Sequence, residues 1–115
     1  MKHTERAFVI RQETQRVVEI LAKLREKAWV LDEFGKGCTT LEFSSKLQKY
    51  RDGGREPIFV IGGSFGLDRE LLRPHTEELL AVSEFTLPHG LALLVLSEQI
   101  YRVHEIWKGS KYHHE

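Results

Sequence analysis

Two apolar runs in the second half of the chain end in residues that are suited to ligand binding. The run 57–61 ends in Gly62 and Gly63. The run 85–87 is followed by a proline and by His89. Glycines after a strand allow the backbone to approach a ligand closely, and ligands of open α/β sheets bind beyond the carboxyl ends of the strands. The glycine spacing matches neither a dinucleotide fingerprint nor a phosphate-binding loop, so a ligand site and a plain tight turn are equal alternatives.

Proton transfer and metal binding are the other chemistries to consider. His89 could be a general base, a hydrogen-bond anchor or a helix cap, and a structural role is the commonest of these for a single histidine. His113 and His114 have no Cys, Asp or Glu at ligand spacing, so no metal site is expected. The one cysteine of the sequence, Cys38, cannot form an internal disulfide. This fits a reducing compartment and a passive thiol.

Length and charge limit the classes of protein that fit the sequence. The 115 residues predict a single domain, 1–115. Lys plus Arg and Asp plus Glu both number 17, so bulk charge does not favour the capture of nucleic acid. No apolar run is as long as a membrane span, and the N-terminus lacks the apolar core of a signal peptide. These features indicate a soluble cytoplasmic protein with no membrane or metal partner.

Apolar periodicity predicts alternating helices and strands. The expected helices are 12–27, one from about residue 40, 68–81 with an interruption at Pro74, and 90–108; the expected strands are 28–31, 57–61 and 84–87, while 7–10 is a strand or a lead-in. Thr39 and Glu42 have capping-box spacing, which predicts the start of the second helix. The alternation predicts a parallel α/β sheet covered by helices on both faces. The last helix is apolar nearly all round at 91–96, which predicts burial against a second subunit.

Several segments together resemble the bacterial 23S ribosomal RNA pseudouridine N3-methyltransferase family. They run in the family's order and spacing from about residue 12 to the C-terminus: Leu31–Lys36 ("LDExGK"), Phe59–Leu67 ("FVIGGxxGL"), Val82–His89 ("LSxxTxPH"), Glu98–Arg102 ("EQLYR") and Tyr112–Glu115 ("YHRE"). The agreement of several independent motifs makes chance a poor explanation. The family's opening strand–helix–strand portion has no counterpart in this chain, so a smaller sheet is expected.

The resemblance implies a methyltransferase of the SPOUT class, with a reduced parallel sheet, a C-terminal trefoil knot and a homodimeric assembly. It also implies that S-adenosylmethionine binds in the knot, where backbone groups of the loops hold it. The cofactor-binding residues that the resemblance implies are Leu31, Gly62, Gly63, Val82, Ser83, Glu84, Phe85, Thr86, Leu87 and Pro88.

The reaction that the resemblance implies is methyl transfer to N3 of a pseudouridine in large-subunit ribosomal RNA, on the ribosome. Alignment of donor and acceptor can supply much of the rate of such a displacement, and a side chain could remove the N3 proton. The implied catalytic residues are His89, Arg102, Tyr112 and His113. In this class the C-terminal tail of one subunit completes the pocket of its partner.

Two positions depart from the family's pattern. Leu93 replaces the arginine of "PHxLxR", and His114 replaces the arginine of "YHRE". Leucine carries no charge, and histidine is mostly neutral at physiological pH. Both changes therefore weaken phosphate recognition. Two alternatives to the methyltransferase follow. One is a knotted S-adenosylmethionine-binding homodimer without methyltransferase activity toward ribosomal RNA. The other is a generic α/β module that binds a nucleotide at the turn of Gly62 and Gly63.

Overall fold

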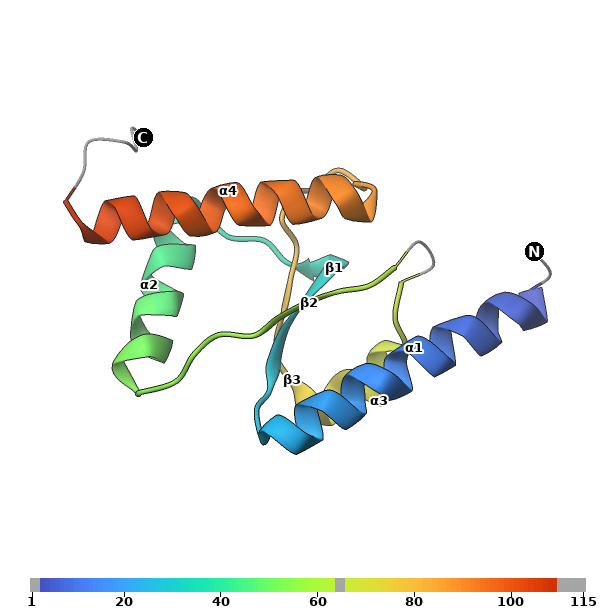
Figure 1. The fold of residues 1–115 in the computed structure, drawn as a ribbon. Helices are drawn as coiled ribbons and strands as arrows, with labels where there is room; N and C mark the ends of the chain where they lie inside the picture. The colour runs from blue at the N-terminus through green and yellow to red at the C-terminus, as the bar shows by residue number, and fades with distance from the viewer. Residues whose placement is uncertain (1–2, 64–65, 110–115) are drawn as a thin grey trace.

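The computed structural model describes residues 3–63 and 66–109, in which helices and strands alternate (Figure 1). The elements in chain order are α1 (His3–Leu24), β1 (Ala28–Lys36), α2 (Thr40–Asp52), β2 (Phe59–Ile61), α3 (Arg69–Leu72), a 3-10 turn (Arg73–His75), β3 (Thr76–Leu80) and α4 (His89–Trp107). This alternation confirms the α/β class that the sequence predicts.

The strands form a three-stranded parallel sheet in the order β2-β1-β3, with β1 in the centre. Residues 29–31 of β1 pair in register with 59–61 of β2. On the other side of β1, both Leu31 and Lys36 pair with Leu80 of β3. Residues 32–35 therefore leave the ladder as a bulge, and this bulge lies at the carboxyl end of the sheet.

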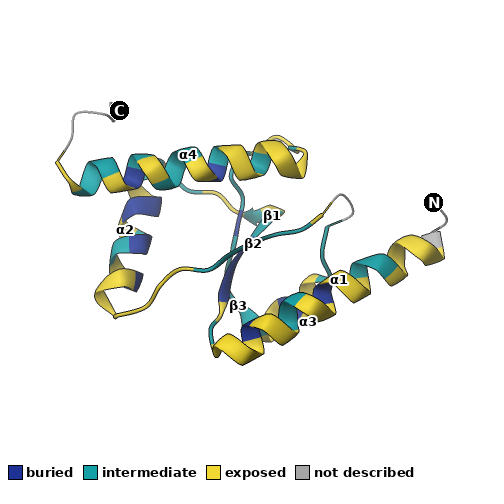
Figure 2. Ribbon diagram, viewed as in Figure 1, coloured by how far each residue is buried: buried dark blue, intermediate teal, exposed yellow. Residues whose placement is uncertain are grey.

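Helices cover both faces of the sheet, as the alternation of elements predicts. On one face, the Trp29 ring packs edge-on against three other aromatic rings, whose centroids are 6.1, 5.7 and 5.8 Å away: Phe43, Tyr50 and Phe59. Leu96 and Val103 of α4 complete this core. On the other face, Val30 packs with Leu21 of α1 and Leu72 of α3. Figure 2 shows the buried residues concentrated on the sheet-facing sides of the helices and along the sheet. Successive residues of β1 thus face opposite cores, which accounts for the unbroken apolar run 28–31.

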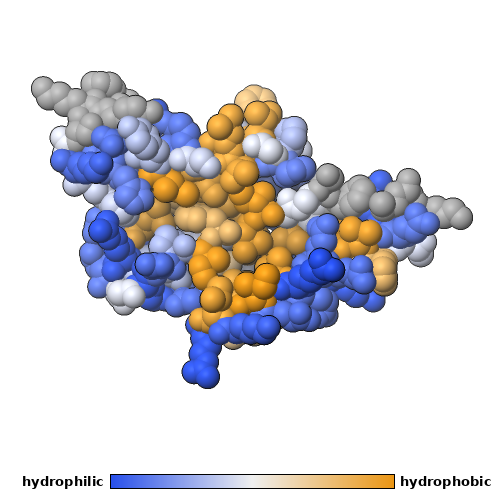
Figure 3. All heavy atoms as spheres, viewed as in Figure 1, coloured by the Kyte–Doolittle hydropathy of each residue, from blue (hydrophilic) through white to orange (hydrophobic). Residues whose placement is uncertain are grey.

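The edge strand β2 leaves apolar surface exposed. Each of its residues is only half-buried, whereas Trp29 and Val30 of the central strand are each 2% exposed. The space-filling view in Figure 3 shows apolar side chains gathered across the middle of this face, between α4 and α1. Strands of parallel sheets are normally covered, so the edge of the sheet at β2 leaves room for further packing.

The predicted starts and ends of several elements are confirmed. Thr39 caps α2 as expected. Its hydroxyl accepts a hydrogen bond from the Glu42 backbone N–H at 3.1 Å, and the Glu42 carboxylate accepts one from the Thr39 N–H at 2.8 Å. This reciprocal pair satisfies donors that the first turn of a helix leaves free. The first strand, the strand before Gly62 and the long last helix are also found where they were predicted.

Three predictions about local structure are wrong. Residues 7–10 belong to α1 and form neither a strand nor a lead-in. Pro74 ends the third helix, because proline lacks an amide hydrogen, and residues 76–80 then form β3 where a helix was expected. Residues 84–87 form no strand. The segment 84–87 pairs with no strand of the described sheet, whose order is β2-β1-β3.

Candidate functional site

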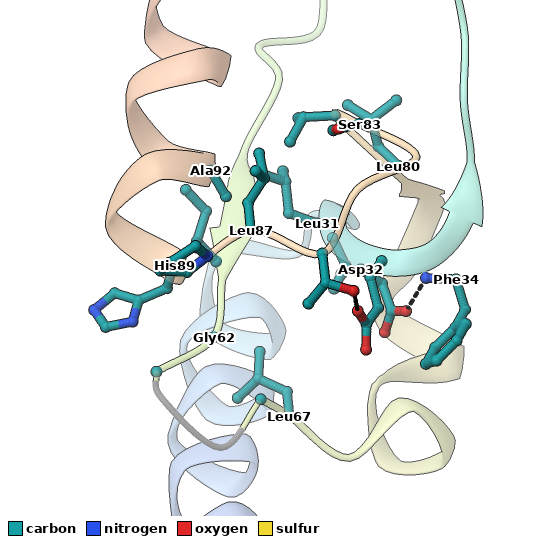
Figure 4. Close-up of a pocket in the computed structure, with 18 of the residues that line it drawn as sticks. Leu31, Asp32, Phe34, Gly62, Leu67, Leu80, Ser83, Leu87, His89 and Ala92 are labelled. Atoms are coloured by element: carbon teal, nitrogen blue, oxygen red, sulfur yellow. Dashed lines mark hydrogen bonds between the residues drawn. The ribbon is translucent and has the colours of Figure 1, made fainter.

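A cavity of about 840 Å³ lies at the carboxyl ends of the strands. Its walls are the bulge of β1, the turn that follows β2, and the segment 82–88 that leads into α4 (Figure 4). Pockets of this size bind small organic ligands, and the position follows the rule for open parallel sheets. Segments that are far apart in the sequence therefore converge on one site, as the two strand ends suggested.

The bulge of β1 supplies two carboxylates to the wall of the cavity. Asp32 accepts a hydrogen bond from the Phe34 backbone N–H at 2.8 Å, and its other oxygen lies 3.5 Å from Nε of Arg69. The Arg69 guanidinium also lies 5.2 Å from the centre of the Phe34 ring. Glu33 accepts a hydrogen bond of 2.6 Å from the Thr86 hydroxyl. This second bond joins the bulge to the segment 82–88, and both segments line the cavity.

The turn after β2 needs glycine for reasons of space. A Cβ on Gly62 would lie 3.0 Å from Cγ of Leu67 and 3.1 Å from the backbone carbon of Gly66. Gly66 itself has φ +80°, a backbone conformation that residues other than glycine rarely adopt. The turn is thus packed against itself, and its backbone is exposed to the cavity on the other side. These contacts explain the glycine at position 62 by the packing of the turn itself, so a ligand site at this turn stays a prediction.

Helix α1 holds this turn in place through Thr14, which is fully buried. Its hydroxyl donates to the carbonyl of Ile10 at 2.7 Å and accepts from the Asp68 backbone N–H at 2.9 Å. Asp68 in turn caps α3 by accepting from the N–H groups of Glu70 and Leu71. The position of the glycine turn therefore depends on a helix that lies more than 50 residues earlier in the chain.

Most of the predicted cofactor-binding residues line the cavity. They are Leu31, Gly62, Gly63, Val82, Ser83, Phe85, Thr86, Leu87 and Pro88. Glu84 is exposed and lies outside the lining. Asp32, Glu33 and Arg69 also line the cavity and were not predicted. An acidic pair directly after a buried strand is the signal that could have pointed to the two carboxylates.

The predicted catalytic residues are found in different places. His89 lies at the edge of the cavity, and its imidazole points outward, away from Leu31 and Leu87 (Figure 4). Arg102 lies on α4 outside the cavity lining, and its guanidinium binds the Glu98 carboxylate with contacts of 2.7 and 3.0 Å. The predictions for Tyr112 and His113, like the substitution at His114, lie outside the described residues.

The Cys38 thiol and the metal-ligating side chains are the other reactive groups to consider. Burial raises the pKa of the Cys38 thiol, which keeps it protonated and poorly nucleophilic. Within residues 3–63 and 66–109, no three His, Cys, Asp or Glu side chains are grouped closely enough to hold a metal ion. In the same part of the chain, no helix combines the length and apolarity needed to cross a membrane.

Comparison with known proteins identifies the class of protein that this fold and site define. Residues 1–113 match the family model described as "Predicted SPOUT methyltransferase". The chain belongs to the SPOUT methyltransferase family.

Its curated relatives carry a more particular name, ribosomal RNA large subunit methyltransferase H. The relative from Anaeromyxobacter sp. (strain Fw109-5) is 47% identical over 96 residues, which cover 82% of this chain and 62% of the relative. The relative from Solidesulfovibrio magneticus is 44% identical over 107 residues, covering 90% and 69%. That from Burkholderia thailandensis is 40% identical over 105 residues, covering 91% and 66%. The chain thus spans about two thirds of the length of the relatives it matches.

Proposed function

We propose that this protein is an S-adenosylmethionine-dependent methyltransferase that acts on N3 of a pseudouridine in large-subunit ribosomal RNA. The observation that carries the proposal is the cavity at the strand ends. Its walls are formed by the segments that match the family's motifs, at Leu31, at the turn of Gly62 and Gly63, and at 82–88. The names of the curated relatives support ribosomal RNA as the substrate.

The residues of the cavity fit the proposed cofactor. The glycine turn lines the cavity with backbone, since Gly62, Gly63 and Gly66 carry no side chains, and backbone groups can bind the adenosine without side-chain chemistry. Half-buried Leu31 and Leu87 offer apolar surface for an adenine ring. The carboxylates of Asp32 and Glu33 suit a ligand that carries positive charge. We also propose that the segments around the cavity form the family's trefoil knot, as the resemblance implies.

The roles of the chain's own residues follow from this arrangement. When bound, S-adenosylmethionine supplies a methyl group that is already activated. The walls of the cavity then have to orient it toward the acceptor, because alignment supplies much of the rate. The imidazole of His89 points out of the cavity on the side from which a large substrate must approach, so it is our candidate to accept the N3 proton.

Assembly into a homodimer is supported by the surface of α4. Leu91 and Leu94 are 49% and 63% exposed, and with the exposed Tyr101 they lie along one stripe of the helix. Exposed apolar stripes of this kind mark interfaces. The radius of gyration is 15.3 Å, whereas a compact chain of this length has about 13 Å. An extended protomer whose α4 exposes one apolar side fits a subunit that packs against a partner.

We propose that the C-terminal tail of one subunit completes the pocket of the other, with Arg102, Tyr112 and His113 near the RNA. We also propose that the protein works in the cytoplasm, where ribosomes are found. A second candidate function is a cofactor-binding homodimer that does not methylate ribosomal RNA. It is favoured by Leu93, an exposed apolar residue where the family's pattern has an arginine.

Truncation of the chain before Lys111 is expected to separate methyl transfer from the binding of S-adenosylmethionine. Methyl transfer to ribosomes should be lost, because the RNA-facing part of the composite pocket is missing, while calorimetry should show unchanged binding of S-adenosylmethionine. The melting temperature serves as the control for folding. Full transfer activity without the tail would contradict the role that we give to the tail.

Replacing Gly62 by alanine is expected to weaken S-adenosylmethionine binding by about tenfold, because the turn must move away from Leu67 and Gly66 and so disturbs the cavity wall. Calorimetry measures this directly. Gly90→Ala is the matched control, since a Cβ there meets nothing within 4 Å and alanine favours a helix. Equal affinity for the two variants would contradict the place of the turn in the pocket.

A further inference from the structure

The positive and negative charges of the side chains that line the cavity do not cancel. Its lining contains the carboxylates of Asp32 and Glu33 and one guanidinium, that of Arg69. Asp32 and Arg69 lie 3.5 Å apart, so their charges largely offset each other. Glu33 accepts a hydrogen bond from a neutral hydroxyl, that of Thr86, and forms no ion pair with any residue that the structure describes. One negative charge therefore remains on the cavity wall.

Thr86 keeps that charge at the cavity. An exposed glutamate has several rotamers and would spend much of its time in solvent. The hydrogen bond from the Thr86 hydroxyl is 2.6 Å long, which is typical of a hydroxyl bound to an ionised carboxylate. Thr86 belongs to the segment 82–88 and Glu33 to the bulge, so the bond ties together two segments that line the cavity and holds the Glu33 carboxylate there.

We infer that Glu33, held by Thr86, makes the pocket prefer the cationic methyl donor to the neutral product of the reaction. This inference rests on the proposed function. S-adenosylmethionine and S-adenosylhomocysteine share the adenosine, the ammonium and the carboxylate. They differ in one methyl group and one positive charge at sulfur. An unbalanced negative charge on the cavity wall acts on that difference through Coulomb attraction, which needs no direct contact. Glu33 is thus a specificity-determining residue that favours release of the product.

The test is calorimetry of both compounds, S-adenosylmethionine and S-adenosylhomocysteine, with the full chain and four variants. Glu33→Gln removes the charge and keeps an oxygen that can accept from Thr86. We expect it to lower the preference for the donor by about three- to fivefold, because the group is exposed and its field is screened. The loss should come from weaker binding of the donor, with binding of the product unchanged. Thr86→Val should shift the preference in the same direction by less, and Thr86→Ser should restore it.

Glu70→Gln is the matched control. It removes a carboxylate that forms an exposed ion pair with Arg73 outside the cavity, so it should keep the preference of the original chain. Melting temperatures of all variants report whether they fold. If Glu33→Gln weakens the binding of both compounds equally, or leaves the ratio of their two affinities unchanged, the inference is overturned and the proposed function stands. If the original chain binds neither compound, the proposed function is overturned and the inference falls with it.

Discussion

Replacing Gly35 by alanine is expected to lower the melting temperature by about 10 °C or more, which corresponds to about 2 to 3 kcal/mol for a chain of this size. Gly35 lies in the bulge of β1. A Cβ there would come within 2.8 Å of the carbonyl carbon and oxygen of Leu79 and within 2.9 Å of the Leu80 nitrogen. These are backbone atoms of β3, so they cannot move without disturbing the pairing of β1 with β3. Thermal unfolding followed by circular dichroism measures the effect.

Gly37→Ala is the control for this variant. Gly37 is two residues further along, and a Cβ there meets nothing within 4 Å. The control should leave the melting temperature within about 2 °C of the original, since a surface change away from any close contact has little effect. A Gly35→Ala variant as stable as its control would show that the bulge does not pack against β3 in the way described.

Replacing Leu94 by lysine is expected to reduce methyl transfer by about 100-fold or more while the chain stays folded. Leu94 is 63% exposed on α4, so a lysine is tolerated by the single subunit. In the proposed dimer it would bury a charge in an apolar interface, which costs several kcal/mol. Light scattering should show the subunit at half the original mass, and transfer should fall because the composite pocket no longer forms.

Ser45→Lys is the matched control for charge. Ser45 is exposed on α2, so the same substitution there should leave both the mass and the transfer unchanged. A Leu94→Lys variant that remains dimeric would show that the exposed stripe of α4 is not the interface. An active monomer would contradict the composite pocket itself.

The parts of the fold that depend on residues close together in the sequence could be predicted from the sequence. The capping pair of Thr39 and Glu42 fixes the start of α2 locally, and the apolar run 28–31 is typical of a strand covered on both faces. The misassigned segments depend on distant partners. Residues 76–80 form a strand because β1 offers them a ladder, whereas 84–87 pair with no strand of the described sheet.

The candidate site shows the same division. Gly62 and Gly63 could be found from their position after a strand, and the family motifs pointed to 82–88. Asp32 and Glu33 reach the cavity because the ladder resumes only at Lys36, again opposite Leu80. No pattern in the sequence reveals that register. The role of Thr14 could not be predicted either, since its partner Asp68 follows it by 54 residues.

Transfer of a methyl group to pseudouridine in large-subunit ribosomal RNA is the activity that we propose for this protein. The most direct measurement is to incubate the protein and S-adenosylmethionine carrying a labelled methyl group with ribosomes from a strain that lacks the N3 methylation. We expect the label to appear in the large-subunit RNA, and mass spectrometry of the digested RNA to find it on N3 of a pseudouridine. Unlabelled RNA in the presence of a protein that binds the cofactor would contradict the claim and leave the inactive cofactor-binding dimer in its place.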